Sequence, residues 1–267
     1  PPDPSGVNSV LKWAGGFTVL ILGMLLLTEY DKNPASSEKP RSSKPVNIQK
    51  AYNKGLNYYE KKKYYMAIDQ FAICLKNEPN HYESRHYRAR SYYFVEDFKS
   101  ALFDLNKIIA QRNETNDHKL RAYAYYDLKE YNNAISDFNY VISFVNDDPK
   151  LFTDRGWSNY LVANFKKSKE DFTQSVDLFK KTNDLSEALA DAYNGRGLAR
   201  VMLKDLKGAK SDLTNAIKYN KEYHQYWFNR GLINSDLNKK RKACKDLKKA
   251  KSLGSFKAES VLKELGC

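Results

Sequence analysis

The sequence predicts an all-α protein: a solenoid of about six helix pairs, followed by a capping helix and preceded by one transmembrane helix. Three observations support this prediction. A small residue recurs at steps of 34, 33, 34, 41 and 34 residues inside a repeated pattern. The 267-residue chain holds only 12 glycines and 8 prolines, which favours helices over turn-rich structure. Residues 13–28 form an apolar run without any charge.

The apolar run predicts a transmembrane helix over residues 10–28, after a short tail of residues 1–9. This stretch approaches the roughly 20 residues that span a bilayer, and Lys12 can extend its amine to the interface. Trp13 and Tyr30 flank the stretch as interfacial aromatic residues do. A secretory signal peptide is the alternative, but the following "TEYDKN" lacks a small-residue cleavage site. We therefore expect a retained anchor.

Residues 29–46, "EYDKNPASSEKPRSSKPV", are rich in Pro, Ser and Lys and predict a flexible tether. One basic residue precedes the apolar run, whereas Lys32, Lys39, Arg41 and Lys44 follow it. The positive-inside rule then places the rest of the chain on the cytoplasmic side. The charge bias does not distinguish a bacterial inner membrane from an organelle membrane.

The rest of the chain is self-similar. The aligned segments are "YYMAIDQFAICL", "FKSALFDLNKII", "YNNAISDFNYVI", "FKKSKEDFTQSV", "LKGAKSDLTNAI" and "KRKACKDLKKAK". Their small residues are Ala67, Ala101, Ala134, Ser168, Ala209 and Ala243. A second small residue lies twelve positions earlier in every copy: Gly55, Ala89, Ala122, Gly156, Gly197 and Gly231. A large apolar residue follows the first small residue by four positions: Phe71, Leu105, Phe138, Phe172, Leu213 and Leu247.

This pattern resembles the tetratricopeptide repeat, a helix pair of about 34 residues with a small residue in each helix. Pro79 and Pro149 match the helix-ending proline of that family. The resemblance implies a right-handed superhelix over residues 47–254 and a capping helix over 255–267. The six expected repeats are 48–81, 82–114, 115–148, 149–189, 190–223 and 224–254. The fourth carries a seven-residue insertion around "KKTNDLSEA".

An arginine and an aspartate sixteen residues apart recur in repeats two to six. The pairs are Arg88 and Asp104, Arg121 and Asp137, Arg155 and Asp171, Arg196 and Asp212, and Arg230 and Asp246. Repeat one carries Lys54 and Gln70 instead. A catalytic pair would not recur in five successive repeats of a solenoid, so we interpret these residues as structural ion pairs. Each would link the first helix of a repeat to the second helix of its own or the preceding repeat.

By the same resemblance, the concave face of the solenoid is lined by first helices, and it is the expected surface for partner proteins. The expected groove residues are Tyr52, Leu56, Tyr59, His86, Arg90, Tyr93, Phe94, Lys119, Tyr123, Tyr126, Trp157 and Tyr160. Tyrosine and tryptophan are favoured in interfaces, although some of them could pack between repeats instead. Arg90 and Lys119 would select an acidic segment. In repeats five and six, an apolar wall is expected from Leu198, Val201, Met202, Phe228 and Leu232.

The expected function is a membrane-anchored protein-interaction scaffold, or a structural or assembly subunit of a membrane protein complex. The alternative is a transient receptor or adaptor for client peptides, like membrane-anchored import receptors of this repeat family. The Lys and Asn clamp that binds heat-shock chaperone tails is absent as a set. For example, Lys119 is followed four residues later by Tyr123. We therefore expect no such chaperone docking.

The formal charge of +13 favours acidic partners. The basic residues concentrate near the C-terminal end, at Lys239, Lys240, Arg241, Lys242, Lys245, Lys248 and Lys249. This basic patch can be a solvated helix face, or it can bind anionic lipid or an acidic partner. No base-reading module accompanies it, which argues against nucleic acid.

The sequence carries no enzyme motif: no phosphate-binding loop, HExxH or nucleophile elbow. The four histidines lack ligand spacing, so we expect no catalytic residue, cofactor or metal. The three cysteines argue against a disulfide framework. Cys74 and Cys244 are interpreted as small buried apolar residues and Cys267 as exposed. The sequon at Asn113 is not expected to be used on the cytoplasmic side.

Overall fold

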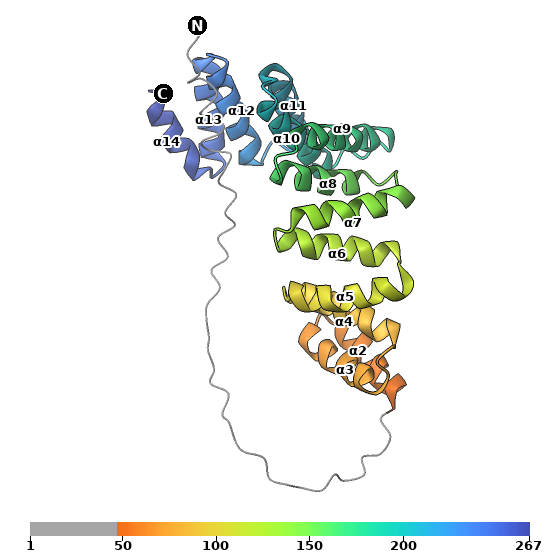
Figure 1. Cartoon of the computed structure of the whole chain (residues 1–267). Helices are drawn as coiled ribbons and strands as arrows, with labels where there is room; N and C mark the ends of the chain where they lie inside the picture. Colours follow the sequence, from red (N-terminus) through yellow and green to blue (C-terminus); the bar gives the residue numbers. More distant parts are fainter. Residues whose placement is uncertain (1–46) are drawn as a thin grey trace.

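The computed structural model describes residues 47–267, which form thirteen α-helices and, within this range, no strand. The six helix pairs are α2 (Ile48–Glu60) and α3 (Tyr64–Asn77); α4 (Tyr82–Phe94) and α5 (Phe98–Arg112); α6 (Thr115–Asp127) and α7 (Tyr131–Phe144); α8 (Pro149–Leu161) and α9 (Phe165–Lys181); α10 (Glu187–Met202) and α11 (Leu206–Tyr219); and α12 (His224–Asp236) and α13 (Lys240–Ser252). Helix α14 (Phe256–Glu264) follows them. The helices stack in chain order along a curved row, each against the next (Figure 1). The predicted all-helical solenoid is confirmed.

The predicted tail, transmembrane helix and tether lie outside the described residues. Among residues 47–267, no helix combines the length and the apolar character needed to cross a bilayer.

Small residues let the two helices of each pair approach closely. All six small residues of the second helices are fully buried, and so are the large apolar residues four positions after them. A Cβ added at Gly55 would lie 2.6 Å from the Phe71 ring, and one at Gly231 would lie 2.8 Å from Leu247. The sequence separation of sixteen therefore brings a small residue of the first helix against a large residue of the second.

The six turns within the pairs share one backbone feature. Each contains a non-glycine residue with positive φ, five positions before the small residue of the second helix. These residues are Lys62, Glu96, Lys129, Ala163, Lys204 and Asn238, with φ between 55° and 65°. The left-handed conformation reverses the chain between two antiparallel helices, and tertiary packing compensates for its cost. The sequence pattern did not indicate it, because no glycine marks these turns.

The insertion in the fourth pair is divided between a longer helix and a longer connection. Helix α9 has 17 residues, whereas the other second helices have 13 to 15. Helix α10 begins at Glu187, three residues before the expected start of the fifth repeat at residue 190. At the end of the row, Ala258, Val261 and Leu262 of α14 join the core cluster of the last pair. Helix α14 thus covers the end of the core.

One cysteine prediction is wrong. Cys244 in α13 forms a disulfide with Cys267, with 5.7 Å between their Cα atoms. Cys244 is half-buried rather than buried. Helix α14 returns the chain to α13, so two cysteines separated by 23 positions meet. A count of cysteines cannot show this return. Cys74 is free and buried, as predicted.

Candidate protein-interaction surface

The five Arg–Asp pairs, called the frame below, join the two helices within repeats two to six. In each pair the guanidinium Nε and Nη2 both donate to the aspartate, with N···O distances of 2.6–3.1 Å. The arginine lies on the first helix of a repeat and the aspartate on the second helix of the same repeat. The aspartates are buried, at 0–5% exposure. These pairs are therefore structural, as the sequence predicted.

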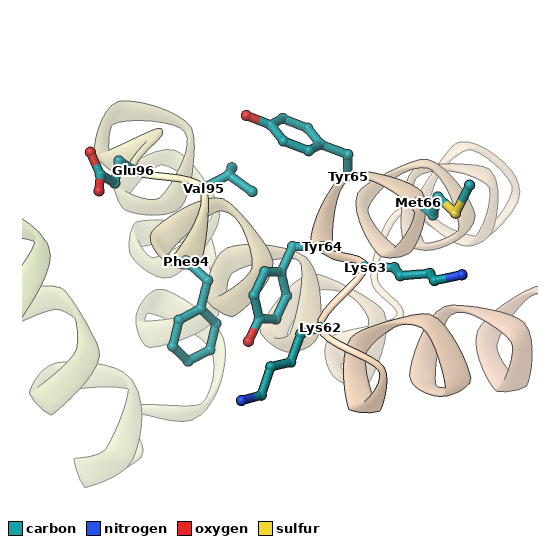
Figure 2. Close-up of a pocket in the computed structure, with 8 residues that line it drawn as sticks. All are labelled: Lys62, Lys63, Tyr64, Tyr65, Met66, Phe94, Val95 and Glu96. Carbon is teal, nitrogen blue, oxygen red and sulfur yellow. The ribbon is translucent and has the colours of Figure 1, made fainter. Parts of the chain in front are cut away.

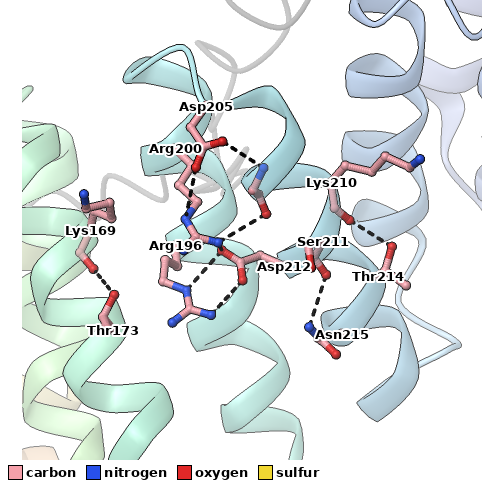
Figure 3. Close-up of polar contacts among 11 residues, drawn as sticks. Lys169, Thr173, Arg196, Arg200, Asp205, Lys210, Ser211, Asp212, Thr214 and Asn215 are labelled. Atoms are coloured by element: carbon pink, nitrogen blue, oxygen red, sulfur yellow. Dashed lines mark hydrogen bonds and ion pairs between the residues drawn. The ribbon is translucent and has the colours of Figure 1, made fainter.

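Each frame aspartate also accepts from a second side chain of the first helix. Figure 3 shows Arg196 and Arg200 converging on Asp212, where Arg200 Nη1 lies 2.7 Å from Oδ2. Likewise, Asn159 Nδ2 donates a hydrogen bond to Asp171, and Asn234 Nδ2 donates one to Asp246, each at 2.9 Å.

Three of the frame arginines also contact the preceding repeat. Arg121 Nη1 donates to Asn106, and Arg155 Nη1 donates to Asn139, both at 2.8 Å. Arg230 Nη1 similarly reaches Thr214 at 3.3 Å. The frame thus fixes the pairs internally and also ties neighbouring pairs together.

The first helices line the inside of the curve. Consecutive first helices pack directly on one another at α2 and α4, α4 and α6, and α8 and α10. No two second helices within residues 47–267 pack as closely. Elements on the inner side of a bent stack lie closer together than those on the outer side, so the concave face belongs to the first helices.

Hydrogen bonds between aromatic side chains and carboxylates cross the concave face from repeat to repeat. Tyr93 Oη donates to Asp127 at 2.9 Å, and His86 Nδ1 lies 2.6 Å from Asp117. Further along, Tyr123 Oη donates to Asp154 at 2.8 Å. Trp157 Nε1 donates to Asp191 at 3.0 Å. Four of the expected groove residues therefore join one repeat to the next.

A tyrosine stripe runs along the first four first helices: Tyr59, Tyr93, Tyr126 and Tyr160. Each lies four residues after the small residue of its helix, and each is half-buried. Tyr126 packs edge-on against Tyr131, and Tyr160 against Phe165. The hydroxyls of Tyr126 and Tyr160 have no hydrogen-bond partner among the described residues. Aromatic side chains fixed in this way offer a contact surface at low entropic cost.

The two expected groove cations are already engaged. Arg90 Nε donates to Tyr59 Oη at 2.9 Å, and its guanidinium lies over the Tyr59 ring. Lys119 Nζ lies 3.4 Å from Asp148. Both side chains are therefore held by contacts within the solenoid. Of the other expected groove residues, Tyr52 packs against Phe71 and His81, and Phe94 is exposed.

Sequence reasoning missed three carboxylates of this face. Burial raises the pKa of Asp154 to about 6, although the Tyr123 hydroxyl and Lys119 oppose the shift. Burial also raises the pKa of Asp191 and of Asp127. Raised pKa values mean that the charged forms lack sufficient stabilisation. One signal was available: an aspartate lies 31 to 34 residues after each of the donors Tyr93, Tyr123 and Trp157.

An open pocket of about 490 Å³ lies at the edge of the first two repeats. Figure 2 shows Tyr64 beside Phe94 in this pocket, and their rings stack at 4.7 Å. Tyr65 and Met66 are exposed there, and Lys62 and Lys63 lie beside them. The pocket lies at the turns of the pairs.

The expected apolar wall of repeats five and six is mostly core. Leu198, Val201, Phe228 and Leu232 are all less than 5% exposed, so they pack between helices. Val201, Phe228 and Leu232 belong to the core cluster formed with Leu213 and Leu247 of the second helices. The residues of the basic patch on and just before α13 are all exposed. Within residues 47–267, no cluster of His, Cys, Asp or Glu could hold a metal.

Comparison with known proteins agrees with this geometry. Residues 224–253 match the family model described as "Tetratricopeptide repeat". The C-terminal part of a TPR repeat-containing protein from Cytophaga hutchinsonii is similar in structure, with a TM-score of 0.64 and 15% identity over 80% of this chain and 84% of that one. YrrB, described as a TPR protein with an unusual peptide-binding site, has a TM-score of 0.60 and 15% identity over 73% and 97% of the two chains.

A third similar structure is the APC/C hetero-tetramer Cut9–Hcn1, with a TM-score of 0.61 and 15% identity. The match covers 82% of this chain and only 42% of that chain. No curated protein matches the sequence. These likenesses concern the fold. Residues 47–267 form a helical solenoid whose fold is similar to that of these tetratricopeptide-repeat proteins.

Proposed function

We propose that this chain is a protein-interaction scaffold that holds a segment of another protein on its concave face. The tyrosine stripe is the observation that carries the proposal. It is preorganised by contacts within and between repeats, it is half-exposed, and the hydroxyls of Tyr126 and Tyr160 have no hydrogen-bond partner among residues 47–267. Residues 10–28 would anchor the scaffold, making it a structural or assembly subunit of a membrane protein complex.

The charges of the concave face favour a basic segment as the occupant. Arg90 and Lys119 are engaged within the chain, whereas Asp154 and Asp191 each retain one carboxylate oxygen without a hydrogen bond from the described residues. A Lys or Arg side chain bound there would stabilise carboxylates whose pKa values are raised by burial. Neighbouring tyrosine rings would add cation–π contacts. This proposal replaces the acidic segment expected from the sequence.

Charge variants of the concave face test this proposal. We expect the double change Asp154→Asn and Asp191→Asn to weaken partner binding about tenfold or more and to reduce its dependence on salt. Asp177→Asn removes an exposed carboxylate from α9, a second helix, and serves as the matched control. Equal loss of binding in both variants, or no loss in either, would contradict docking on the concave face.

A transient receptor for client peptides is the second candidate, supported by the likeness to YrrB. The stoichiometry of the tagged full chain, extracted gently from its own membrane, distinguishes the two candidates. A subunit co-purifies with partners at a fixed ratio in one large particle. A receptor is recovered as a lone chain with substoichiometric clients. The basic patch on α13 would contact anionic lipid or an acidic partner in either case.

A further inference from the structure

The disulfide between Cys244 and Cys267 bears on where the solenoid resides. It is the covalent link between α13 and the end of α14, and α14 covers the apolar end of the core. The remaining cysteine, Cys74, is fully buried against α2, so it cannot exchange with the pair without unfolding. The chain thus holds one specific bridge and one protected thiol.

The surroundings of Cys244 suit formation of the bridge. Cys244 lines an open hollow of about 640 Å³ together with Lys240, Arg241, Lys245 and Lys248. A thiolate is the nucleophile in thiol–disulfide exchange, and neighbouring cations stabilise it. The two thiols are oxidised together. An external disulfide accepts their two electrons and two protons and leaves as two thiols, while the Cys244–Cys267 bond forms.

We infer that the solenoid resides in an oxidising compartment, on the side of its membrane that faces away from the cytosol, and that the bridge clamps α14 onto α13 there. Structural disulfides persist in such compartments, whereas the cytosol keeps thiols reduced. This location is opposite to the one predicted from Lys32, Lys39, Arg41 and Lys44. It also places the partner of the concave face in the same oxidising compartment.

The bridge further assigns a role to α14. Ala258, Val261 and Leu262 are buried against the last pair, and an uncovered solenoid end would present this apolar surface to other chains. A covalent clamp keeps that end closed.

Counting thiols in the full chain tests the bond. Cells are lysed under denaturing conditions in a membrane-permeant alkylating agent, which blocks every free thiol, including that of the buried Cys74. The protein is then denatured, reduced and labelled with a maleimide of known mass. We expect two added labels, from Cys244 and Cys267, and none when the reduction step is left out. A chain that gains no label after reduction was a free dithiol in the cell, and this result would overturn the inference.

Two variants keep the assay specific. Cys74→Ser is expected to retain both labels, because that thiol takes no part in the bridge. Cys267→Ser is expected to gain none after reduction. Two labels in Cys267→Ser would show that Cys244 pairs elsewhere, and this would contradict the clamp.

The side of the membrane is tested separately with the full chain in vesicles of known orientation. Protease added to the non-cytosolic face should digest the solenoid, and protease added to the cytosolic face should not. The reverse pattern would overturn the assigned location. A failure of partner binding would leave both results unchanged, so this inference and the proposed function are tested independently.

Discussion

At the residue scale, five buried Arg–Asp pairs, each sixteen residues apart, hold the two helices of repeats two to six together. The spacing is fixed by helix geometry, since it places one residue on each helix of a tightly packed pair. The second partners of the aspartates, such as Arg85, Arg200 and Asn234, were not predicted. They lie twelve residues before the aspartate for Asn159, Arg200 and Asn234 and nineteen before it for Arg85 and His118, so the sixteen-residue pattern alone did not mark them.

Removing one frame arginine should destabilise the fold. In Arg155→Ala, the buried Asp171 retains only Asn159 as a hydrogen-bond partner among the described residues, and α8 loses its link to Asn139. We expect the free energy of unfolding to fall by about 3 kcal/mol, as is typical when one partner of a buried pair is lost. Urea denaturation followed by circular dichroism measures this loss.

Lys54→Ala is the matched control, because Lys54 occupies the equivalent position in repeat one, is exposed, and has no aspartate opposite. We expect a change within about 0.5 kcal/mol. Partner binding by folded Arg155→Ala should remain. Unchanged stability together with lost binding would show that the arginine belongs to a site instead of the frame.

Asp154 should make the stability of the protein depend on pH. Its pKa is raised from 3.8 to about 6 in the folded state, so the folded protein takes up a proton before the unfolded chain does. Stability from this group is therefore present below about pH 4 and is lost as the pH rises through about 6. Asp154→Asn should remove this pH dependence. The free energy of unfolding is measured by urea denaturation at about pH 4.5 and about pH 7, at one salt concentration. An unchanged pH dependence would show that Asp154 is not the group that titrates.

At the element scale, the repeat pattern predicts how helices pair but not every close contact between them. Gly195 was outside the pattern, yet a Cβ at this position would overlap the buried ring of Phe172 in α9. The contact lies between pairs, at the junction of α9 with α10. Residues at such junctions depend on the angle between repeats, and the spacing within a repeat does not determine that angle.

Gly195→Ala should separate α9 from α10. The added methyl group has no free space, so we expect a loss of about 1–3 kcal/mol in the free energy of unfolding, even though alanine favours helices. Combining it with Phe172→Leu tests the mechanism, because the smaller side chain leaves room. The double variant should lose less than the sum of the two single changes. Additive losses would argue against a steric cause.

Reducing the disulfide should loosen α14 selectively. The bridge closes a loop across residues 244–267, and a loop of this size contributes about 3 kcal/mol in the chain-entropy model. Amide hydrogen exchange should therefore accelerate in α14 after reduction and stay unchanged in α6 and α7. Uniform acceleration along the whole chain would contradict a local clamp.

At the scale of the whole molecule, the sequence predicts a curved row of helix pairs, and the structure adds the charge of its inner face. The chain has a formal charge of +13, yet the concave face carries Asp127, Asp154 and Asp191. Total charge did not predict this, because the basic residues lie elsewhere, notably in the basic patch on α13. The two cations that had been assigned to the groove are held by neighbours: Arg90 Nε donates to Tyr59 Oη, and Lys119 Nζ lies 3.4 Å from Asp148.

Site-specific photo-crosslinking tests the central claim, that the concave face holds another protein. A photoreactive phenylalanine analogue replaces Tyr160 on the concave face or, in a second sample, Tyr65, which is 72% exposed on the second helix α3. After irradiation of the full chain in its own membrane, adducts are identified by mass spectrometry. We expect one protein to be captured reproducibly from position 160 and not from position 65. Capture from position 65 alone, or no capture from position 160, would contradict the account.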